Sequence, residues 1–246
     1  MGKIVAIGGG EISEKETLEI DRAIVRLTGK LNPAALFIPT ASGEPDGYIA
    51  SFEQVYGELL GCKTSTLKLI GEESSEIQIR EKILSADIIY VGGGDTERML
   101  DIWQSKQVNK YLAEAYQKDI VLSGLSAGSI CWFKYGHSDS LSYRTGKQQD
   151  FFKIDGLGFV EGIHCPHYTE EARQKDFDAM VSENNEIGIA LDDNCAIEIN
   201  NGQFKILKSN PLAKAFKVFI RGDGQLVKTE LTNEEYLPME FLYSKK

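Results

Sequence analysis

Residues 119–133 have the sequence DIVLSGLSAGSICWF, and this stretch decides the expected fold. Residues 119–123 are mostly apolar and predict a buried strand, whereas the apolar residues 129–133 predict a helix. Between them, residues 124–128 (GLSAG) match the G-x-S-x-G pattern of a nucleophile elbow. Small residues on both sides of Ser126 leave room for a tight, strained turn. The stretch therefore predicts a strand, a nucleophilic Ser126 and a helix; the alternative is a glycine-rich connection in which Ser126 caps the helix.

Short apolar runs and amphipathic stretches alternate on both sides of this elbow, as they do where helices cover a buried sheet. Strands are expected at residues 3–7, 34–38, 64–69, 88–91, 119–123, 159–162, 188–191, 196–199, 203–207, 217–221 and 226–229. Helices are expected at 14–29, 48–60, 75–84, 96–115, 129–133 and 169–182. This order predicts a single α/β domain over residues 1–246, a three-layer sandwich whose largely parallel sheet is flanked by helices, with antiparallel additions near the C-terminus.

Composition narrows the class of function. The formal net charge is -10 at pH 7, which disfavours binding to nucleic acids or to anionic membrane surfaces. The 4 cysteines are scattered, and the first apolar run is too short for a signal peptide, so we expect a cytoplasmic location with reduced thiols. The expected partner is a small substrate, and the oligomeric state, including a homo-oligomer, is left open.

A serine nucleophile needs a base, and the chain has 3 histidines. His167 follows the mostly apolar run 159–163, so it should project at the carboxyl end of a strand, where α/β active sites gather. His164 lies earlier in the same strand and is expected to be a core or supporting residue. His137 follows the elbow helix and is expected in a loop near the site. These positions favour His167 as the base.

The base must be oriented by an acid, and the oxyanion must be stabilised by backbone amides. Asp139 would give the chain order Ser, Asp, His, whereas Asp192 or Asp193 would follow the histidine at the end of another strand. The two amides are expected from Gly93, in the glycine-rich turn after strand 88–91, and from Ala127. The alternative for each aspartate is a capped turn.

Three other classes of protein were weighed. The sequence GGGEIS follows the first strand, but Ser13 replaces the third glycine of a dinucleotide-binding fingerprint. A metal hydrolase would lack regular ligand spacing because of Pro166, and its ligands would come from His164, Cys165, His167 and Cys195. A noncatalytic binding or sensor protein could keep the same elbow. The serine hydrolase requires no metal and no cofactor.

Four motifs in order resemble the peptidase E family: FIPTA at 37–41, VGGGDT at 91–96, GLSAG at 124–128 and PHY at 166–168. The resemblance implies a fold like that of the class I glutamine amidotransferases, with serine in place of their cysteine. It further implies a serine peptidase with a Ser-His-acid mechanism and an acyl-enzyme. Ser126 and His167 match the family's nucleophile and base, and Asp139 is favoured over Asp193 as the acid.

The same resemblance implies a substrate class. Its best-known members hydrolyse short peptides at aspartyl bonds, as dipeptidases, and the cyanophycinase-like members hydrolyse an aspartate-rich polymer. Both substrates carry carboxylates, which require a cation in the site. Arg173, on the helix expected after His167, is the candidate for that role.

Overall fold

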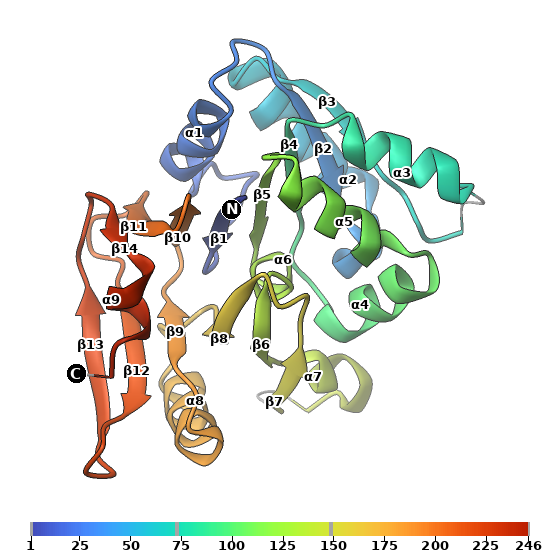
Figure 1. Ribbon diagram of the computed structural model, residues 1–246. Helices are drawn as coiled ribbons and strands as arrows, with labels where there is room; N and C mark the ends of the chain where they lie inside the picture. Colours follow the sequence, from blue (N-terminus) through green and yellow to red (C-terminus); the bar gives the residue numbers. More distant parts are fainter. Residues whose placement is uncertain (1, 72–73, 148–149, 246) are drawn as a thin grey trace.

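The computed structural model describes residues 2–71, 74–147 and 150–245, and it confirms the mixed α/β class (Figure 1). Its larger sheet has the strand order β14 (Leu237–Pro238), β11 (Gln203–Lys208), β10 (Cys195–Asn200), β1 (Lys3–Ile7), β5 (Val121–Leu125), β4 (Ile88–Val91), β2 (Ala34–Ile38) and β3 (Lys63–Thr66). The strands from β1 to β3 in this order are parallel. The three on the other side of β1 are antiparallel, as expected for the C-terminal additions.

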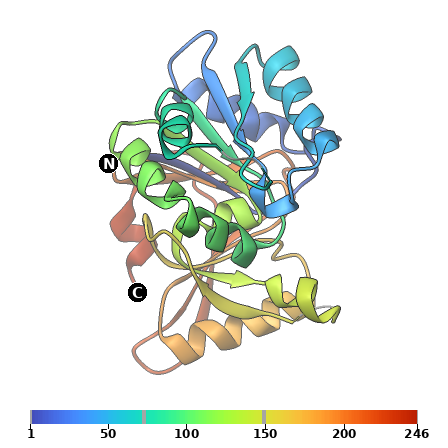
Figure 2. The ribbon, with the colours of Figure 1, turned by 90° about the vertical axis from the view of Figure 1, so that its right-hand side faces the viewer.

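Helices cover both faces of this sheet because its strands are apolar on both sides. In β1, Ile4 and Ala6 belong to one core, whereas Val5 and Ile7 belong to the other. The first core packs against α3 (Glu76–Leu84), α4 (Thr96–Ser105) and α5 (Val108–Gln117). The second packs against α1 (Leu18–Leu27), α2 (Asp46–Phe52) and the π-helical η2 (Glu53–Leu59). Figure 2 shows these two helical layers on either side of the sheet.

A second, smaller sheet was not predicted. Its strand order is β13 (Leu226–Leu231), β12 (Ala215–Ile220), β9 (Gly188–Leu191), β8 (Val160–Cys165), β6 (Phe133–Ser138) and β7 (Phe152–Asp155). Strands β6, β8 and β9 are parallel to one another. The long helix α8 (Glu171–Asn184) buries Phe177 and Val181 against this sheet. Figure 1 shows β6, β8 and β9 below the larger sheet, with α8 beneath them.

Two expected helices end differently. The elbow helix α6 covers only Ala127–Ile130, because the carbonyls of Cys131 and Trp132 accept hydrogen bonds from Leu157 and Phe159 and the chain turns into β6. The expected helix 96–115 is divided into α4 and α5 at Gln107, whose φ of 58° interrupts the helical backbone. The remaining short helices are η1 (Thr40–Ser42), α7 (Ser140–Thr145) and α9 (Met239–Tyr243).

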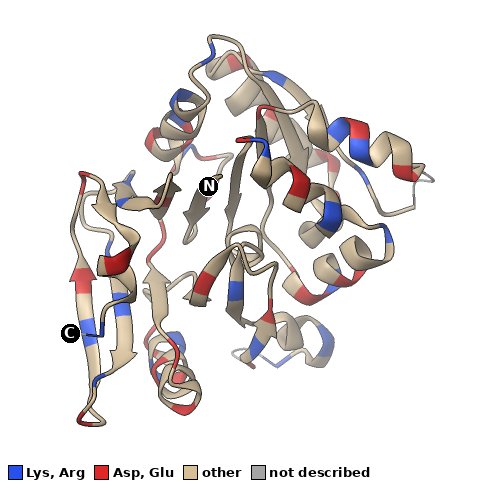
Figure 3. Cartoon of the chain, viewed as in Figure 1, with Lys and Arg blue, Asp and Glu red and all other residues tan. Residues whose placement is uncertain are grey.

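The surface is of mixed charge, with Lys and Arg interspersed among Asp and Glu over the helices and the C-terminal strands (Figure 3). Within the described ranges, none of the helices combines the length and the apolar character that crossing a membrane requires.

Candidate active site

The glycine-rich loop after β1 holds three other strand ends together. The carbonyls of the last residue of β1 and of the first two residues of this loop accept one backbone hydrogen bond each from the segments after β5, β8 and β9. The donor and acceptor atoms are Ser126 N and Ile7 O at 3.1 Å, His167 N and Gly8 O at 3.0 Å, and Asn194 N and Gly9 O at 2.9 Å. The carboxyl ends of these strands therefore meet at one place, as they do in other open α/β sheets.

Ser126 lies on a strained turn between β5 and α6, with φ 57° and ψ -114°. The turn requires glycine on both sides. A Cβ on Gly124 would lie 2.2 Å from the carbonyl oxygen of Gly128, and one on Gly128 would lie 2.1 Å from that of Val91. Ser126 is half-buried, whereas all other residues from 121 to 130 are buried. The elbow thus presents one hydroxyl at the surface of the core.

The side chains of Ser126, His167 and Asp193 form a continuous hydrogen-bonded chain. The His167 Nε2 lies 2.9 Å from the Ser126 Oγ, and the Nδ1 lies 2.6 Å from the Asp193 Oδ1. A carboxylate can only accept, so Nδ1 carries the imidazole proton and Nε2 is left to accept from the hydroxyl. This is the arrangement in which a histidine can take a proton from a serine.

The preference for Asp139 over Asp193 is corrected by the structure. Asp139 accepts a hydrogen bond from Arg173 at 2.8 Å and makes no described contact with His167. The reason is sheet order: β9 pairs with β8, so the residues after β9 lie beside His167. Asp192 faces away, since its carboxylate accepts from the amide of Lys214 at 2.9 Å.

Arg173 is not where a substrate cation is needed. Its side chain is only 5% exposed and is paired with Asp139. Its guanidinium also lies 4.6 Å from the centre of the Phe151 ring, and Arg173 does not line the cavity around Ser126. The guanidinium therefore ties α8 to the segment between β6 and α7, and the expectation that it binds substrate is not supported.

Gly9 is a site residue that the sequence analysis did not identify. A Cβ there would lie 1.8 Å from the Asp193 Oδ1 and 2.5 Å from the His167 Nδ1. Any side chain would therefore separate the acid from the base. The signal was present in the run Gly8-Gly9-Gly10, which was weighed only as a dinucleotide-binding motif.

The two expected oxyanion donors lie beside Ser126. Ala127 is the first residue of α6, so its amide has no partner within the helix. Gly93 is close enough that a Cβ on it would lie 3.3 Å from the Ser126 Cβ, and its amide donates to the Tyr48 hydroxyl oxygen at 3.3 Å. Burial raises the pKa of Tyr48 to about 12, so this hydroxyl keeps its proton and can donate it.

These groups open into a cavity of about 480 Å³. This volume is within the usual range of small-molecule sites. The cavity is lined by Gly10, Glu11, Ser13, Gly47, Tyr48, Ser51, Gly93, Gly94, Leu125, Ser126 and His167.

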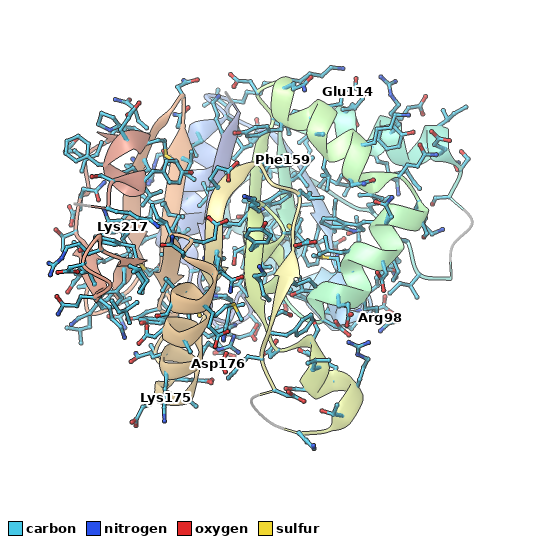
Figure 4. All side chains as sticks on the ribbon, turned by 60° about the horizontal axis from the view of Figure 1, so that its bottom comes forward. Arg98, Glu114, Phe159, Lys175, Asp176 and Lys217 are labelled. Atoms are coloured by element: carbon cyan, nitrogen blue, oxygen red, sulfur yellow. The ribbon has the colours of Figure 1, made fainter. Side chains whose placement is uncertain are left out.

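The other two histidines are buried. His164 is in the core, as expected, with its Nε2 2.8 Å from the Ser129 Oγ. His137 lies in β6 rather than in the expected loop. It contacts Asp176 of α8 at 2.9 Å and the Cys165 Sγ at 3.7 Å; Figure 4 labels Asp176 on that helix. Burial raises the pKa of the Cys165 thiol, so the cluster of Cys165, His137 and Asp176 holds a protonated thiol and no reactive thiolate.

Comparisons with known proteins show the family of the chain. The model of peptidase family S51 matches residues 4–207. The uncharacterized peptidase YgaJ of Bacillus subtilis (strain 168) is 35% identical over 226 residues, covering 89% of this chain and 93% of the relative.

Two solved structures have the same fold. A peptidase from an acI-B1 Actinobacterium has a TM-score of 0.73 at 19% identity, with 97% of both chains covered. A putative peptidase E protein from Listeria monocytogenes EGD-e has a TM-score of 0.64 at 21% identity, with 85% of this chain and 98% of that chain covered. The chain is therefore a peptidase of family S51, the peptidase E family.

Proposed function

We propose that this chain is a serine peptidase that hydrolyses short peptides through Ser126, His167 and Asp193. The observation that carries the proposal is the pair of hydrogen bonds on His167, 2.9 Å to the Ser126 Oγ and 2.6 Å to the Asp193 Oδ1, beside an open cavity. An imidazole held between a hydroxyl and a carboxylate in this way activates the hydroxyl as a nucleophile.

The proposed reaction has two halves. His167 Nε2 takes the proton of Ser126 as its oxygen attacks the peptide carbonyl, and the carboxylate of Asp193 stabilises the imidazolium that forms. The imidazolium then gives the proton to the leaving amine, and the C–N bond breaks to leave an acyl-enzyme. Water, deprotonated by His167, attacks the ester; the imidazolium then returns this proton to the Ser126 oxygen as the ester C–O bond breaks, which releases the acid and free Ser126.

The oxyanion of each tetrahedral intermediate needs donors aimed at the place where charge develops. The amide of Ala127, at the start of α6, is the first proposed donor, and the amide of Gly93 is the second. In the absence of substrate the Gly93 amide donates to Tyr48, and a 3.3 Å bond is long enough to be exchanged for a stronger one to an oxyanion.

The proposed substrate class is the dipeptide or other short peptide. A cavity of about 480 Å³, lined by residues from several strand ends, accommodates a ligand of that size. Substrate binding needs no cofactor in this proposal, and location in the cytoplasm remains part of the proposal.

The test is hydrolysis of a panel of dipeptides and of an aspartate-rich branched polymer by the wild type and by Ser126→Ala, with and without EDTA. Turnover should be insensitive to EDTA and should be lost in Ser126→Ala. Ser182→Ala is the matched control, because this exposed serine on α8 only bonds the Asp178 carbonyl of its own helix. Undiminished turnover by Ser126→Ala would refute the serine mechanism.

Labelling with a fluorophosphonate distinguishes a serine peptidase from a noncatalytic binding protein with the same fold. A catalytically competent serine should react covalently, and the label should be absent from Ser126→Ala. A wild type that neither reacts with the label nor hydrolyses any substrate would favour the noncatalytic binding protein on the same fold.

A further inference from the structure

The lining of the cavity around Ser126 and His167 contains an acidic side chain and no Lys or Arg among the described residues. Among the described residues that line it, Glu11 is the only Asp, Glu, Lys or Arg. Glu11 belongs to the loop between β1 and α1, which continues from the glycines that hold the candidate catalytic residues. A peptide that reaches Ser126 therefore meets a carboxylate in this cavity.

The carboxylate of Glu11 is held in place from within its own loop. Its Oε1 accepts hydrogen bonds from the Ser13 amide at 3.2 Å and from the Ser13 hydroxyl at 3.0 Å. Its backbone amide donates to Glu16 at 2.8 Å, which ties down the start of the turn. Among the described residues, nothing donates to Oε2. One carboxylate oxygen is thus fixed, and the other is available to a ligand.

The charge of Glu11 acts across the cavity. Burial is the main cause of the raised pKa of Tyr48, and the negative charge of Glu11 raises it further. Tyr48 accepts the hydrogen bond from Gly93, so the field of Glu11 extends to the wall that carries a proposed oxyanion donor.

The arginines close to this region lie elsewhere. Arg98, labelled on α4 in Figure 4, and Arg144 line a separate cavity of about 500 Å³ that meets the first one at Gly94. Arg144 is paired with Glu97, and Arg173 is buried against Asp139. A substrate carboxylate beside Glu11 would be repelled and would meet no Lys or Arg among the described residues that line the same cavity.

We propose that Glu11 makes this site selective for short peptides that present an ammonium group near the scissile bond, and against peptides with an N-terminal aspartate. This inference rests on the proposed function and names its substrate class. The ammonium is either the α-amino group of the peptide or the side chain of a lysine, since both can donate to the free oxygen of Glu11.

The test is calorimetric binding to Ser126→Ala, which does not need turnover. The ligands are Ala-Leu, Lys-Leu, Asp-Leu and N-acetyl-Lys-Leu. Asp-Leu should bind about fivefold more weakly than Lys-Leu at low salt, and the ratio should shrink as salt is added. If the α-amino group is the partner, N-acetyl-Lys-Leu binds weakly; if the lysine side chain is the partner, it binds as well as Lys-Leu.

Two further substitutions make the result specific to Glu11. In the Ser126→Ala background, Glu11→Gln should abolish the discrimination between Lys-Leu and Asp-Leu. Glu14→Gln, in the same loop, exposed and outside the cavity lining, should leave it unchanged. Circular dichroism of both variants checks that they fold.

The inference is overturned if Asp-Leu binds as tightly as Lys-Leu, if the discrimination survives Glu11→Gln, or if none of the peptides binds. A preference for Asp-Leu that disappears in Arg98→Gln would place the recognition in the neighbouring cavity instead. Hydrolysis by the wild type is measured separately, so loss of this inference leaves the serine mechanism to be judged on the activity of Ser126→Ala.

Discussion

The molecule contains two serine–histidine pairs built on the same two elements. Ser126 and Ser129 belong to the elbow and its helix α6, and His164 and His167 belong to β8 and the turn that follows it. The Oγ to Nε2 distances are nearly equal, 2.9 Å in the pair Ser126–His167 and 2.8 Å in the pair Ser129–His164. A serine within hydrogen-bond distance of a histidine therefore does not by itself distinguish a catalytic site from a structural contact.

The third partner and the access of solvent make the difference. His167 Nδ1 donates to the carboxylate of Asp193, whereas His164 Nδ1 donates to the carbonyl of Ile189. The His164 ring is fully buried, and burial lowers its pKa to about 3. Proton transfer to His164 would create a charge in an apolar core, whereas a proton on His167 is matched by a negative charge and lies beside an open cavity.

The largest expected effect comes from changing Asp193, the third partner in the exposed pair. In Asp193→Asn, an amide can donate to Nδ1 and thereby hold the wrong imidazole tautomer, so kcat should fall by about 10⁴-fold with little change in KM. Steady-state hydrolysis of a dipeptide measures it.

Asp139→Asn is the matched control for that prediction, because Asp139 contacts Arg173 and not His167. It should retain most of kcat. A comparable loss of kcat in both variants would contradict the assignment of Asp193.

A smaller loss of kcat is expected when Asp193 is displaced from the pair Ser126–His167 but no catalytic group is removed. In Gly9→Ala, the new methyl would overlap the Asp193 Oδ1 at 1.8 Å and push the acid away from His167. A displacement of this kind should lower kcat by about 10²-fold. Gly222→Ala, where nothing lies within 4 Å of the added carbon, should leave kcat unchanged; an unaffected Gly9→Ala would show that the close contact is not needed.

The buried pair should respond in stability rather than in activity. Ser129→Ala leaves the buried His164 Nε2 without its partner and removes a 2.7 Å hydrogen bond to the Ser126 carbonyl. The free energy of unfolding should fall by about 2 kcal/mol. Urea unfolding measures the loss, and hydrolysis should continue; a variant that is fully stable but inactive would reverse the roles given to the two pairs.

The last expected effect, which appears only as the pH is lowered, is the pH dependence of the stability that the buried pair contributes. The pKa of His164 is lowered from 6.5 to about 3, so between these values the unfolded chain binds a proton that the folded chain does not. The contribution to stability is complete above about pH 6.5 and is lost as the pH falls, by about 1.4 kcal/mol per pH unit. Asp21 acts in the opposite direction, because burial raises its pKa from 3.8 to about 7.

The difference in unfolding free energy between the wild type and His164→Gln isolates the histidine from Asp21. That difference should shrink as the pH falls below 6.5. A difference that stays constant between pH 6.5 and 4 would show that His164 has no lowered pKa in the folded protein.

The sequence predicts the parallel core well. Residues 3–7, 34–38 and 88–91 of the larger sheet, and 188–191 of the smaller one, are apolar runs between turn residues, and each forms a strand with the expected bounds. The second sheet was missed because β6, with the sequence FKYGHS, mixes polar and apolar residues and follows the elbow helix directly. Its pairing with β7 and β8 is a tertiary effect that local sequence does not show.

The site also has a part that local sequence predicts and a part that depends on the tertiary structure. The elbow and the position of His167 after a strand could be found locally, and the structure brings these two residues together. The choice between Asp139 and Asp193 depends on which strand lies beside β8, and that order is absent from spacing along the chain. Gly9 could have been found only by knowing that β1 pairs with β5. This pairing brings the loop after β1 to the side chains of His167 and Asp193.

The three carbonyls of residues 7–9 make assembly of the site depend on the order in which the chain is synthesised. Residues 7–9 are synthesised before their last partner along the chain, the amide of Asn194. Asp193 immediately precedes it, so a nascent chain that ends before this point has the serine and the histidine but not the acid that orients them. The hydrogen-bonded chain through His167 can therefore close only after Asp193 has been made, when β1 to β5, the parallel strands of the larger sheet, have all been synthesised.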